Sequence, residues 1–375
     1  MNVSIVSGLG FGDEGKGMTT NYLCNRNPGN TIVVRYGGGN QVGHTVIGPD
    51  GKLHTHHHTG SGTLSGVPTF YSKFCTFDPI GVLREIDRIK DKYPELKIRI
   101  GYDPRAMVVT PFDHRAQIIH IPNLGHGTVG VGFGTTIQRN EDHYRLYAVD
   151  LLNPWILNEK IKSIQNYYAA KGVAVSDPII DQWLVYCAEF IKEPGIEIKP
   201  FWNFNDVTED NDIVFEGHQG ILLDMEYGLF PHVTRSKTTC KNAYLFMEEE
   251  GIDAINAVQY LITRAYHTRH GNGPFLNGAI LLKNNEAETN VSNQYQGVFK
   301  TAPLDIDLLK HAILCNIIDN GGRSPYQHIV ITCLDQVAEP VETIKTIRES
   351  TKGYEFFISG IYTSYDSTSN LKSLA

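Results

Sequence analysis

The chain has no excess of positive charge: 33 lysines and arginines stand against 41 aspartates and glutamates, which gives a formal net charge of −8. Because a protein that binds nucleic acid usually carries a basic patch, we expect no nucleic-acid partner. The sequence also lacks long runs of like charge, so it has no acidic or basic tail. No apolar run approaches the roughly 18 residues needed to span a membrane, so we expect no membrane partner either.

Cysteine is scarce and scattered, and no CxxC pair occurs. The six cysteines are Cys24, Cys75, Cys187, Cys240, Cys315 and Cys333. This usage is typical of a reducing compartment, where disulfides are rare. The first residues begin a strand at once, without a basic or long apolar leader, so we expect no export. These features favour a cytoplasmic location.

Four short runs of β-branched residues each lead into a glycine-rich or polar loop. They are residues 3–7, 31–35, 212–216 and 328–332. Loops at the carboxyl ends of strands are typical of a mostly parallel sheet that carries sites along one edge. Candidate helices lie between the runs, at 78–92, 153–171, 181–192, 241–265 and 305–320. The first two open with an N-cap residue followed by proline.

These patterns predict an α/β fold with a mostly parallel central sheet flanked by helices. We expect residues 1–375 to form one large domain with helical and loop insertions. The polar stretches at 122–143 and 284–301 are too long for simple turns, so we expect them to cover a site.

The first loop, GFGDEGKG at residues 10–17, is P-loop-like but lacks one element. Gly10, Gly15 and Lys16 fit the P-loop spacing, but residue 17 is glycine, without the hydroxyl that binds magnesium. Backbone N–H groups can cradle a phosphate here, and Lys16 adds a positive charge. Asp13 would repel a phosphate, so we expect it to hold Mg²⁺ or to remove a proton from a second substrate. The alternative is an ordinary glycine turn before a helix.

Two further stretches carry candidate chemistry. His44 follows a glycine-rich strand end in GGGNQVGHT (37–45), and an imidazole that titrates near neutral pH suits a general acid. In 215–239, the Gln219 amide could read a base edge, and the hydroxyls and cations of 234–238 suit a monophosphate. The alternatives are a surface histidine and a solvated loop.

Two other histidine patterns are weaker candidates. A metal site at His54, His56, His57 and His58 is not expected, because no nearby cysteine or carboxylate completes a ligand set. His114 beside Asp113 resembles a base with its orienting acid, but no nucleophile motif accompanies the pair.

Together these stretches resemble the adenylosuccinate synthetase family of purine-biosynthesis ligases. The family motifs occur in order along nearly the whole chain: GDEGKG at 12–17, GHT at 43–45, FEGxQGxLLDxxxGxxPxVTxSxTT at 215–239, TRxGxGPF at 268–275 and a TKLD-like stretch at 332–335. The resemblance implies the family's α/β fold, a homodimer and a two-step reaction. The γ-phosphate of a nucleoside triphosphate goes to O6 of a 6-oxopurine, and the amine of L-aspartate then displaces it.

The resemblance also implies roles for individual residues. Asp13 is the base and a Mg²⁺ ligand together with the Gly43 carbonyl, His44 is the acid, and Lys16 steadies the transferring phosphate. Nucleotide binding falls to Gly10, Gly12, Glu14, Gly15, Lys16, Gly17, Gly43, His44, Thr45, Thr332 and Asp335. Purine monophosphate binding falls to Asn40, Gln41, Thr128, Gln219, Leu223, Val233 and Thr234. Aspartate binding falls to Asn290, Val291, Ser292 and Asn293.

The chain departs from the family pattern where ligands are expected. NVSNQYQGVFKTAPLD at 290–305 replaces the arginine-rich loop that holds aspartate, so Lys300, Arg269 or backbone amides must take its place. Cys333 replaces the lysine that packs on the guanine of GTP. Other changes at or near ligand positions are Gln41, Val129, His143, Arg235 and Lys237.

Because these changes cluster around both nucleotides, we expect altered substrates. They fit a branch encoded by phages that put 2,6-diaminopurine in their DNA, acting in the host cytoplasm. That branch condenses dGMP with aspartate, uses ATP, and yields 2-amino-2′-deoxy-N6-succinyladenylate. One alternative is adenylosuccinate synthesis from IMP with GTP or ATP. The other is an NTP-dependent switch or binding protein, although GDEGKG lacks the Ser/Thr of switch GTPases.

Overall fold

The computed structural model describes residues 1–124, 129–283, 298–321, 323, 326–354, 358–364 and 371–374. Within these residues, ten strands form one sheet. Neighbouring strands run parallel, except that the two strands nearest the C-terminus, β15 and β16, are antiparallel. The order is β16 (Lys372–Leu374), β15 (Ile358–Thr363), β14 (Tyr326–Thr332), β11 (Val258–Arg264), β1 (Val3–Gly8), β10 (Asp212–Glu216), β2 (Thr31–Arg35), β5 (Thr69–Tyr71), β7 (Ile100–Tyr102) and β9 (Ile196–Ile198). The expected mostly parallel α/β sheet is confirmed.

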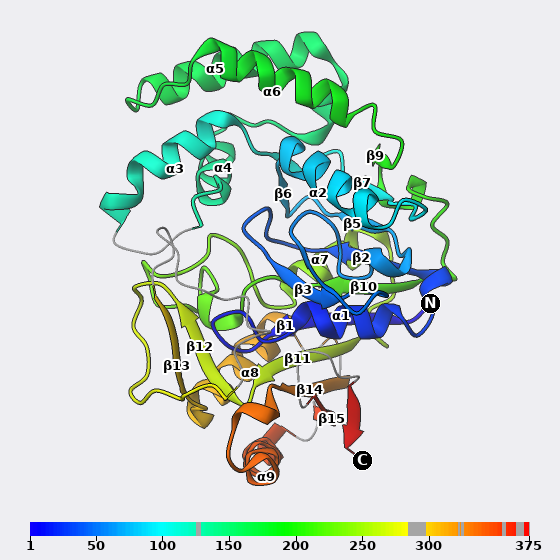
Figure 1. Cartoon of the computed structure of the whole chain (residues 1–375), viewed down its shortest axis with the longest axis vertical. Helices are drawn as coiled ribbons and strands as arrows, with labels where there is room; N and C mark the ends of the chain where they lie inside the picture. The colour runs from blue at the N-terminus through cyan, green and yellow to red at the C-terminus, as the bar shows by residue number, and fades with distance from the viewer. Residues whose placement is uncertain are drawn as a thin grey trace.

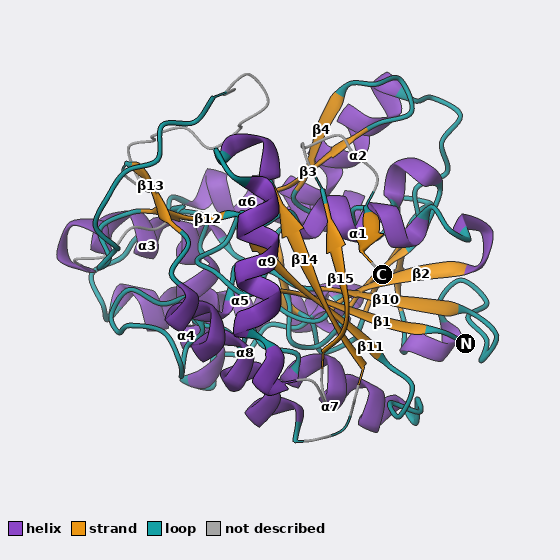
Figure 2. Cartoon of the chain, turned by 90° about the horizontal axis from the view of Figure 1, so that it is seen from below, coloured by secondary structure: helices purple, strands orange, loops and turns teal. Residues whose placement is uncertain are grey.

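Helices cover both faces of this sheet (Figures 1 and 2). They are α1 (Lys16–Cys24), α2 (Pro79–Lys92), α3 (Pro111–Leu124), α4 (Phe133–Glu141), α5 (Pro154–Ala169), α6 (Asp177–Phe190), α7 (Lys241–Glu250), α8 (Ile306–Asn320) and α9 (Pro340–Ser350). Three two-stranded ribbons lie outside the large sheet. They pair β3 (His44–Ile47) with β4 (Leu53–His56), β6 (Thr76–Phe77) with β8 (Met107–Val108), and β12 (Tyr266–His270) with β13 (Phe299–Pro303). No helix in the described residues is both long enough and apolar enough to cross a membrane.

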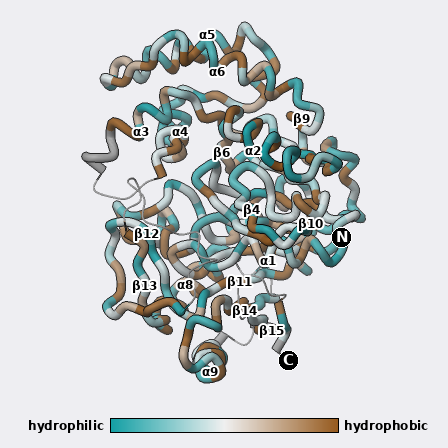
Figure 3. The backbone as a smooth tube through the Cα atoms, viewed as in Figure 1, coloured by the Kyte–Doolittle hydropathy of each residue, from teal (hydrophilic) through white to brown (hydrophobic). Residues whose placement is uncertain are grey.

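The central strands alternate their side chains between two apolar layers. Ile5 of β1 packs with Tyr244 and Met247 of α7, whereas Val6 packs with Leu23 of α1 on the opposite face. This two-residue alternation follows from the pleat of a strand. Because both faces are buried, the strands read as continuous apolar runs. In Figure 3, by contrast, the outer helices α5 and α6 alternate between brown and teal, as amphipathic helices do.

The helix predicted over 241–265 is wrong in its second half. Helix α7 ends at Glu250, where Gly251 adopts the left-handed conformation with φ 70° that commonly stops a helix. Residues 258–264 (VQYLITR) instead form β11 beside β1. Their β-branched and aromatic side chains suit a buried strand.

The other predicted helices are found with shifted ends. At the starts of α2 and α5, Asp78 accepts a hydrogen bond from the Ile80 N–H at 3.1 Å, and Asn153 accepts one from the Trp155 N–H at 3.1 Å. Helix α6 begins at Asp177, four residues earlier than predicted. The polar stretch 122–143 contains the end of α3 and the whole of α4, while most of 284–301 lies outside the described residues.

Asp113 and His114 do not form a base with its orienter. The Asp113 carboxylate accepts bonds from Arg139 Nε at 2.9 Å and from the Tyr168 hydroxyl at 2.7 Å, which ties α3 to α4 and α5. His114 Nε2 lies 3.6 Å from Asp78 Oδ2 instead. Because Asp113 and Arg139 are both fully buried, this pair belongs to the core.

Replacing Asp113 by alanine should therefore destabilise the fold strongly. The Arg139 guanidinium would stay buried without its carboxylate, and breaking such a pair typically costs about 3–5 kcal/mol. Denaturant unfolding would measure the change in free energy of unfolding, with Asp181→Ala on the exposed face of α6 as the matched control. Equal effects of the two substitutions would contradict the assignment.

Candidate active site

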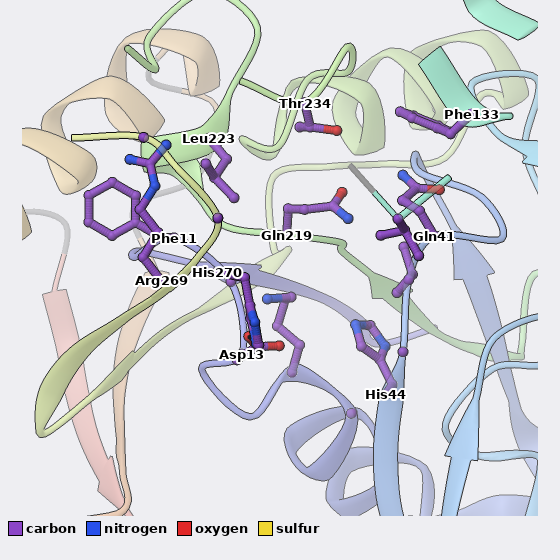
Figure 4. Close-up of a pocket in the computed structure, with 18 of the residues that line it drawn as sticks. Phe11, Asp13, Gln41, His44, Phe133, Gln219, Leu223, Thr234, Arg269 and His270 are labelled. Carbon is purple, nitrogen blue, oxygen red and sulfur yellow. Dashed lines mark ion pairs between the residues drawn. The ribbon is translucent and has the colours of Figure 1, made fainter. Parts of the chain in front are cut away.

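A cavity of 1290 Å³ lies along the carboxyl ends of the central strands (Figure 4). Its walls come from the opening loop, the β3–β4 ribbon, and segments 129–138, 219–235, 264–273 and 332–336. A site for one small ligand usually measures about 300–1,000 Å³. The cavity is therefore large enough for more than one ligand.

The opening loop is shaped by Glu14. Its buried carboxylate accepts hydrogen bonds from the N–H groups of Gly10 at 3.0 Å and Gly12 at 2.8 Å, and it pairs with Lys16. Gly10 and Glu14, expected to contact the nucleotide, do not line the cavity; they form the inside of the loop. Gly12, Asp13, Lys16 and the glycines on either side of that lysine do line it.

The glycine at position 17 has a packing reason. A Cβ atom there would lie 2.8 Å from His44 Cβ and 3.1 Å from Ser61 Oγ. The serine or threonine of an ordinary P-loop would collide with both residues. The absence of a side chain at position 17 thus leaves room for His44 to pack against the start of α1.

Asp13 faces the cavity from a constrained backbone. Its φ is 61°, its carbonyl oxygen accepts from Arg264 Nε, and His270 Nε2 lies 3.3 Å from its Oδ2. Burial alone would raise the pKa of Asp13, but the hydrogen bond to His270 and the charges of His270, Arg264 and Lys16 hold it below its usual value. Asp13 is therefore an ionised carboxylate that can accept a proton or bind a cation.

His44 is oriented from behind by a buried carboxylate. Its Nδ1 lies 2.7 Å from Glu216 Oε1, and Glu216 also accepts from the Ser61 N–H at 3.2 Å. Burial lowers the pKa of His44, and the negative charge of Glu216 opposes that shift. Burial would raise the pKa of Glu216, but His44, Arg35 and Ser61 bring it down to about 2.

This arrangement fixes how His44 can act. Since the Glu216 carboxylate only accepts hydrogen bonds, the Nδ1 of His44 carries a hydrogen. His44 lines the cavity, and its buried Nε2 has no hydrogen-bond partner among the described residues. It can donate to a substrate only as the imidazolium, whose charge Glu216 stabilises. Because burial leaves the pKa of His44 below its usual value despite Glu216, the imidazole is mostly neutral at rest, and acid catalysis by His44 would need Nε2 to take up a proton first.

The expected purine-monophosphate residues divide into three groups. Gln41, Gln219, Leu223, Val233 and Thr234 line the cavity. Both amide atoms of Gln41 are buried without a hydrogen-bond partner among the described residues, as a ligand contact would require. Asn40 does not line the cavity, and its Nδ2 donates to the Val131 carbonyl at 2.9 Å. Thr128 lies outside the described residues, as do the four expected aspartate-binding residues Asn290, Val291, Ser292 and Asn293.

The remaining expected nucleotide residues reach the cavity. Gly43, Thr45, Thr332 and Asp335 all line it. Thr332 Oγ1 also donates to the Glu14 carbonyl at 2.7 Å, so β14 braces the opening loop. The oxygens of Asp13 and of the Gly43 carbonyl are the hard donors that magnesium prefers, so the residues present fit Mg²⁺.

The cation cluster expected around 234–238 is largely neutralised. Lys237 pairs with Glu226, and its Nζ lies 3.4 Å from Asp319 Oδ2; it does not line the cavity. Arg235 does line it, but pairs with Glu141. Of the hydroxyls in this segment, only that of Thr234 reaches the cavity.

The histidine run contains a carboxylate neighbour that the sequence did not reveal. Glu85 of α2 comes close to His54 and His56, contrary to the expectation that no carboxylate was near. Its oxygens already accept from the N–H groups of His57 at 3.0 Å and His58 at 2.8 Å, and from Thr59. Glu85 therefore anchors the turn that places His57 in the cavity wall.

Sequence reasoning missed three residues that support the chemistry: Glu216, Arg264 and His270. Each stands at or beside the end of a strand, which is the signal that could have found them. Their contacts depend on β1 lying between β10 and β11, a neighbourhood that no local pattern encodes.

Known proteins resemble this chain in sequence and in fold. Residues 5–351 match the sequence model of the adenylosuccinate synthetase family. An adenylosuccinate synthetase of Caldanaerobacter subterraneus subsp. tengcongensis is 31% identical over 293 residues. The alignment covers 73% of this chain and 65% of that relative, so the chain spans less than two thirds of the relative's length.

Two solved structures share the fold. The fully ligated adenylosuccinate synthetase from Plasmodium falciparum has a TM-score of 0.75 at 17% identity, with both chains covered fully. Cyanophage S-2L succinoaminodeoxyadenylate synthetase, bound to dGMP and dATP as an energy donor, has a TM-score of 0.65 at 14% identity. That match covers 99% of this chain and 95% of the other. At these identities the likeness concerns the fold alone.

If Glu216 acts through His44, substitutions of the two residues should not have additive effects, and a double-mutant cycle can test this. Glu216→Gln should slow aspartate-dependent phosphate release by about 10²-fold or more, because the imidazolium loses its counter-charge, and His44→Asn by about 10²–10⁴-fold. Since Glu216 acts through His44, the double variant should be no slower than His44→Asn alone. Multiplying losses would contradict this, provided thermal unfolding shows that all three variants fold.

Proposed function

Because the chain belongs to the adenylosuccinate synthetase family, we propose that it is a carbon–nitrogen ligase that joins L-aspartate to C6 of a purine nucleotide. In its finer form the proposal names dGMP as acceptor and ATP as phosphoryl donor. The product is then 2-amino-2′-deoxy-N6-succinyladenylate, a precursor of diaminopurine DNA. The observation that carries the proposal is the meeting of an ionised Asp13, of His44 with the Glu216 carboxylate behind it, and of Lys16 in one cavity.

The side chains account for each proton in the first step. Asp13 accepts the N1 proton of the 6-oxopurine, which makes O6 a better nucleophile toward the γ-phosphorus. As the bond from O6 to that phosphorus forms, the bond from the phosphorus to the bridging oxygen breaks, and the nucleoside diphosphate leaves. His44 Nε2 donates a hydrogen bond toward O6, and Lys16 balances the charge of the transferring phosphoryl group. A magnesium ion held by Asp13 and the Gly43 carbonyl would neutralise phosphate charge.

In the second step the aspartate amine attacks C6, and the bond from C6 to O6 breaks. Inorganic phosphate leaves with the former O6, and the amine loses a proton. Arg269 is suited to hold a substrate carboxylate. It is 3% exposed, donates to the carbonyls of Pro274 at 2.9 Å and His232 at 3.1 Å, and forms no ion pair with the described residues. A buried guanidinium in a cavity wall without an acidic partner favours an anionic ligand.

Two features support the finer substrates. Cys333 lines the cavity beside Asp335, so position 333 itself offers no cation to pack on a guanine ring, whereas Asp335 could accept from the N6 amino group of adenine. Guanine also keeps the N1 proton that Asp13 must remove. The cyanophage enzyme with the shared fold was solved with dGMP and with dATP as an energy donor, which supports dGMP as acceptor and an adenine nucleotide as donor here.

A matrix of acceptors and donors tests the proposal. With aspartate present, we expect kcat/KM for dGMP to exceed that for IMP by about tenfold or more, since one missing contact in a polar site costs about 1–3 kcal/mol. GMP should fall below dGMP, and ATP should support at least the rate seen with GTP. Initial rates of succinyl-purine formation measure all three comparisons.

Other outcomes would assign the chain differently. An IMP value equal to or above that of dGMP would indicate ordinary adenylosuccinate synthesis. Strict dependence on GTP would contradict the assignment of the base site around Cys333. Phosphate release that needs neither aspartate nor a purine monophosphate would indicate an NTP-dependent switch instead.

A further inference from the structure

Guanine differs from hypoxanthine by an amino group at C2, next to the N1 proton that Asp13 would remove. We propose that His270 determines acceptor specificity by fixing the Asp13 carboxylate, so that its two oxygens accept N1–H and the 2-amino group of a guanine nucleotide. This inference rests on the proposed function. It assigns acceptor specificity to His270, which occupies the first variable position of the TRxGxGPF motif.

His270 reaches the opening loop from the end of β12. Its Nε2 lies 3.3 Å from Asp13 Oδ2, and its side chain is 14% exposed in the cavity wall. On its other side, the ring packs against Phe299 of β13, with centroids 5.0 Å apart. Because an ionised carboxylate only accepts, the hydrogen of this bond sits on His270 Nε2. The imidazole is therefore fixed in position and donates a hydrogen bond to Oδ2 of Asp13.

The backbone of Asp13 is held as well. Its φ of 61° is uncommon for a residue with a side chain, and its carbonyl oxygen is bound by Arg264. With the main chain and Oδ2 both fixed, the plane of the carboxylate has little freedom to turn. Each oxygen of a carboxylate has two acceptor sites, so Oδ2 can still accept from a ligand.

The order of atoms around a purine ring sets where the 2-amino group falls. N1 stands between C6 and C2, so a purine with O6 toward His44 and N1 toward Asp13 directs its C2 substituent away from His44. Figure 4 shows the Asp13–His270 pair together, across the cavity from His44. We assign the oxygen that His270 fixes to the 2-amino group. Hypoxanthine, which has no such group, needs only the other oxygen.

The test compares two acceptors that differ only at C2: dGMP and 2′-deoxyinosine monophosphate. Removing the held donor in His270→Leu should lower the dGMP-to-deoxyinosinate ratio of kcat/KM by roughly tenfold to a hundredfold, the size of one well-placed buried hydrogen bond. His270→Gln keeps an N–H donor and should restore much of the ratio. Calorimetric binding of both nucleotides without ATP should show the same change.

His311→Leu is the matched control, since His311 is exposed on α8 and does not line the cavity. It should leave the ratio unchanged. Equal losses for both acceptors in His270→Leu would overturn the inference, because His270 would then merely support the loop. If the wild-type protein prefers dGMP and His270→Leu keeps that preference, this inference alone fails. If the wild-type protein prefers deoxyinosinate, the proposed function fails with it.

Discussion

The Asp13 carboxylate keeps its negative charge inside a loop whose N–H groups and lysine are suited to anions. Three cationic or hydrogen-bonding side chains make this tolerable: Lys16 from the same loop, Arg264 at the end of β11 and His270 at the end of β12. The loop's inner N–H groups are taken by Glu14 rather than by Asp13. Asp13 does not take part in these hydrogen bonds and lines the cavity together with Lys16 and the glycines on either side of that lysine.

The position of His44, on the other side of the cavity, depends on the same loop. Because position 17 has no side chain, His44 packs against α1, and its ring reaches the buried Glu216. Glu216 in turn lies 4.0 Å from the buried Arg35, so the charge that supports His44 is balanced inside the protein. Asp13, in the loop after β1, and His44, in β3, thus both lie beside the start of α1, which restricts their spacing as the proposed reaction on one purine ring would require.

Much of the fold could be predicted from the sequence, because the buried parallel strands carry continuous apolar runs that end in glycine-rich loops. The strand β11 was not predicted, since its residues follow α7 closely and read as a continuation of it; Gly251 was the local sign of the break. The motifs also predicted Asp13, His44 and Gln219 in one site, because the ends of parallel strands meet at one edge.

The contacts behind those residues could not be predicted. Glu216 touches His44 across 172 positions of sequence, and Lys237 is neutralised by Asp319, 82 positions away. Charge counted along the chain therefore overestimated the cations available to a phosphate. His270 was not predicted because it occupies a variable position of a motif. Its role depends on its contact with Asp13, which only the folded structure shows.

The central claim is that O6 of the acceptor attacks the γ-phosphate of the donor, with Asp13 as base and His44 as acid. Acceptor nucleotide labelled with ¹⁸O at C6 tests this directly, with ATP, magnesium and aspartate present and mass spectrometry of the released phosphate. The account predicts that each phosphate released with a succinyl-purine carries one ¹⁸O. It also predicts that the Asp13→Ala variant releases almost no labelled phosphate. Unlabelled phosphate formed at the rate of product would contradict it, because O6 would then never have been bonded to phosphorus.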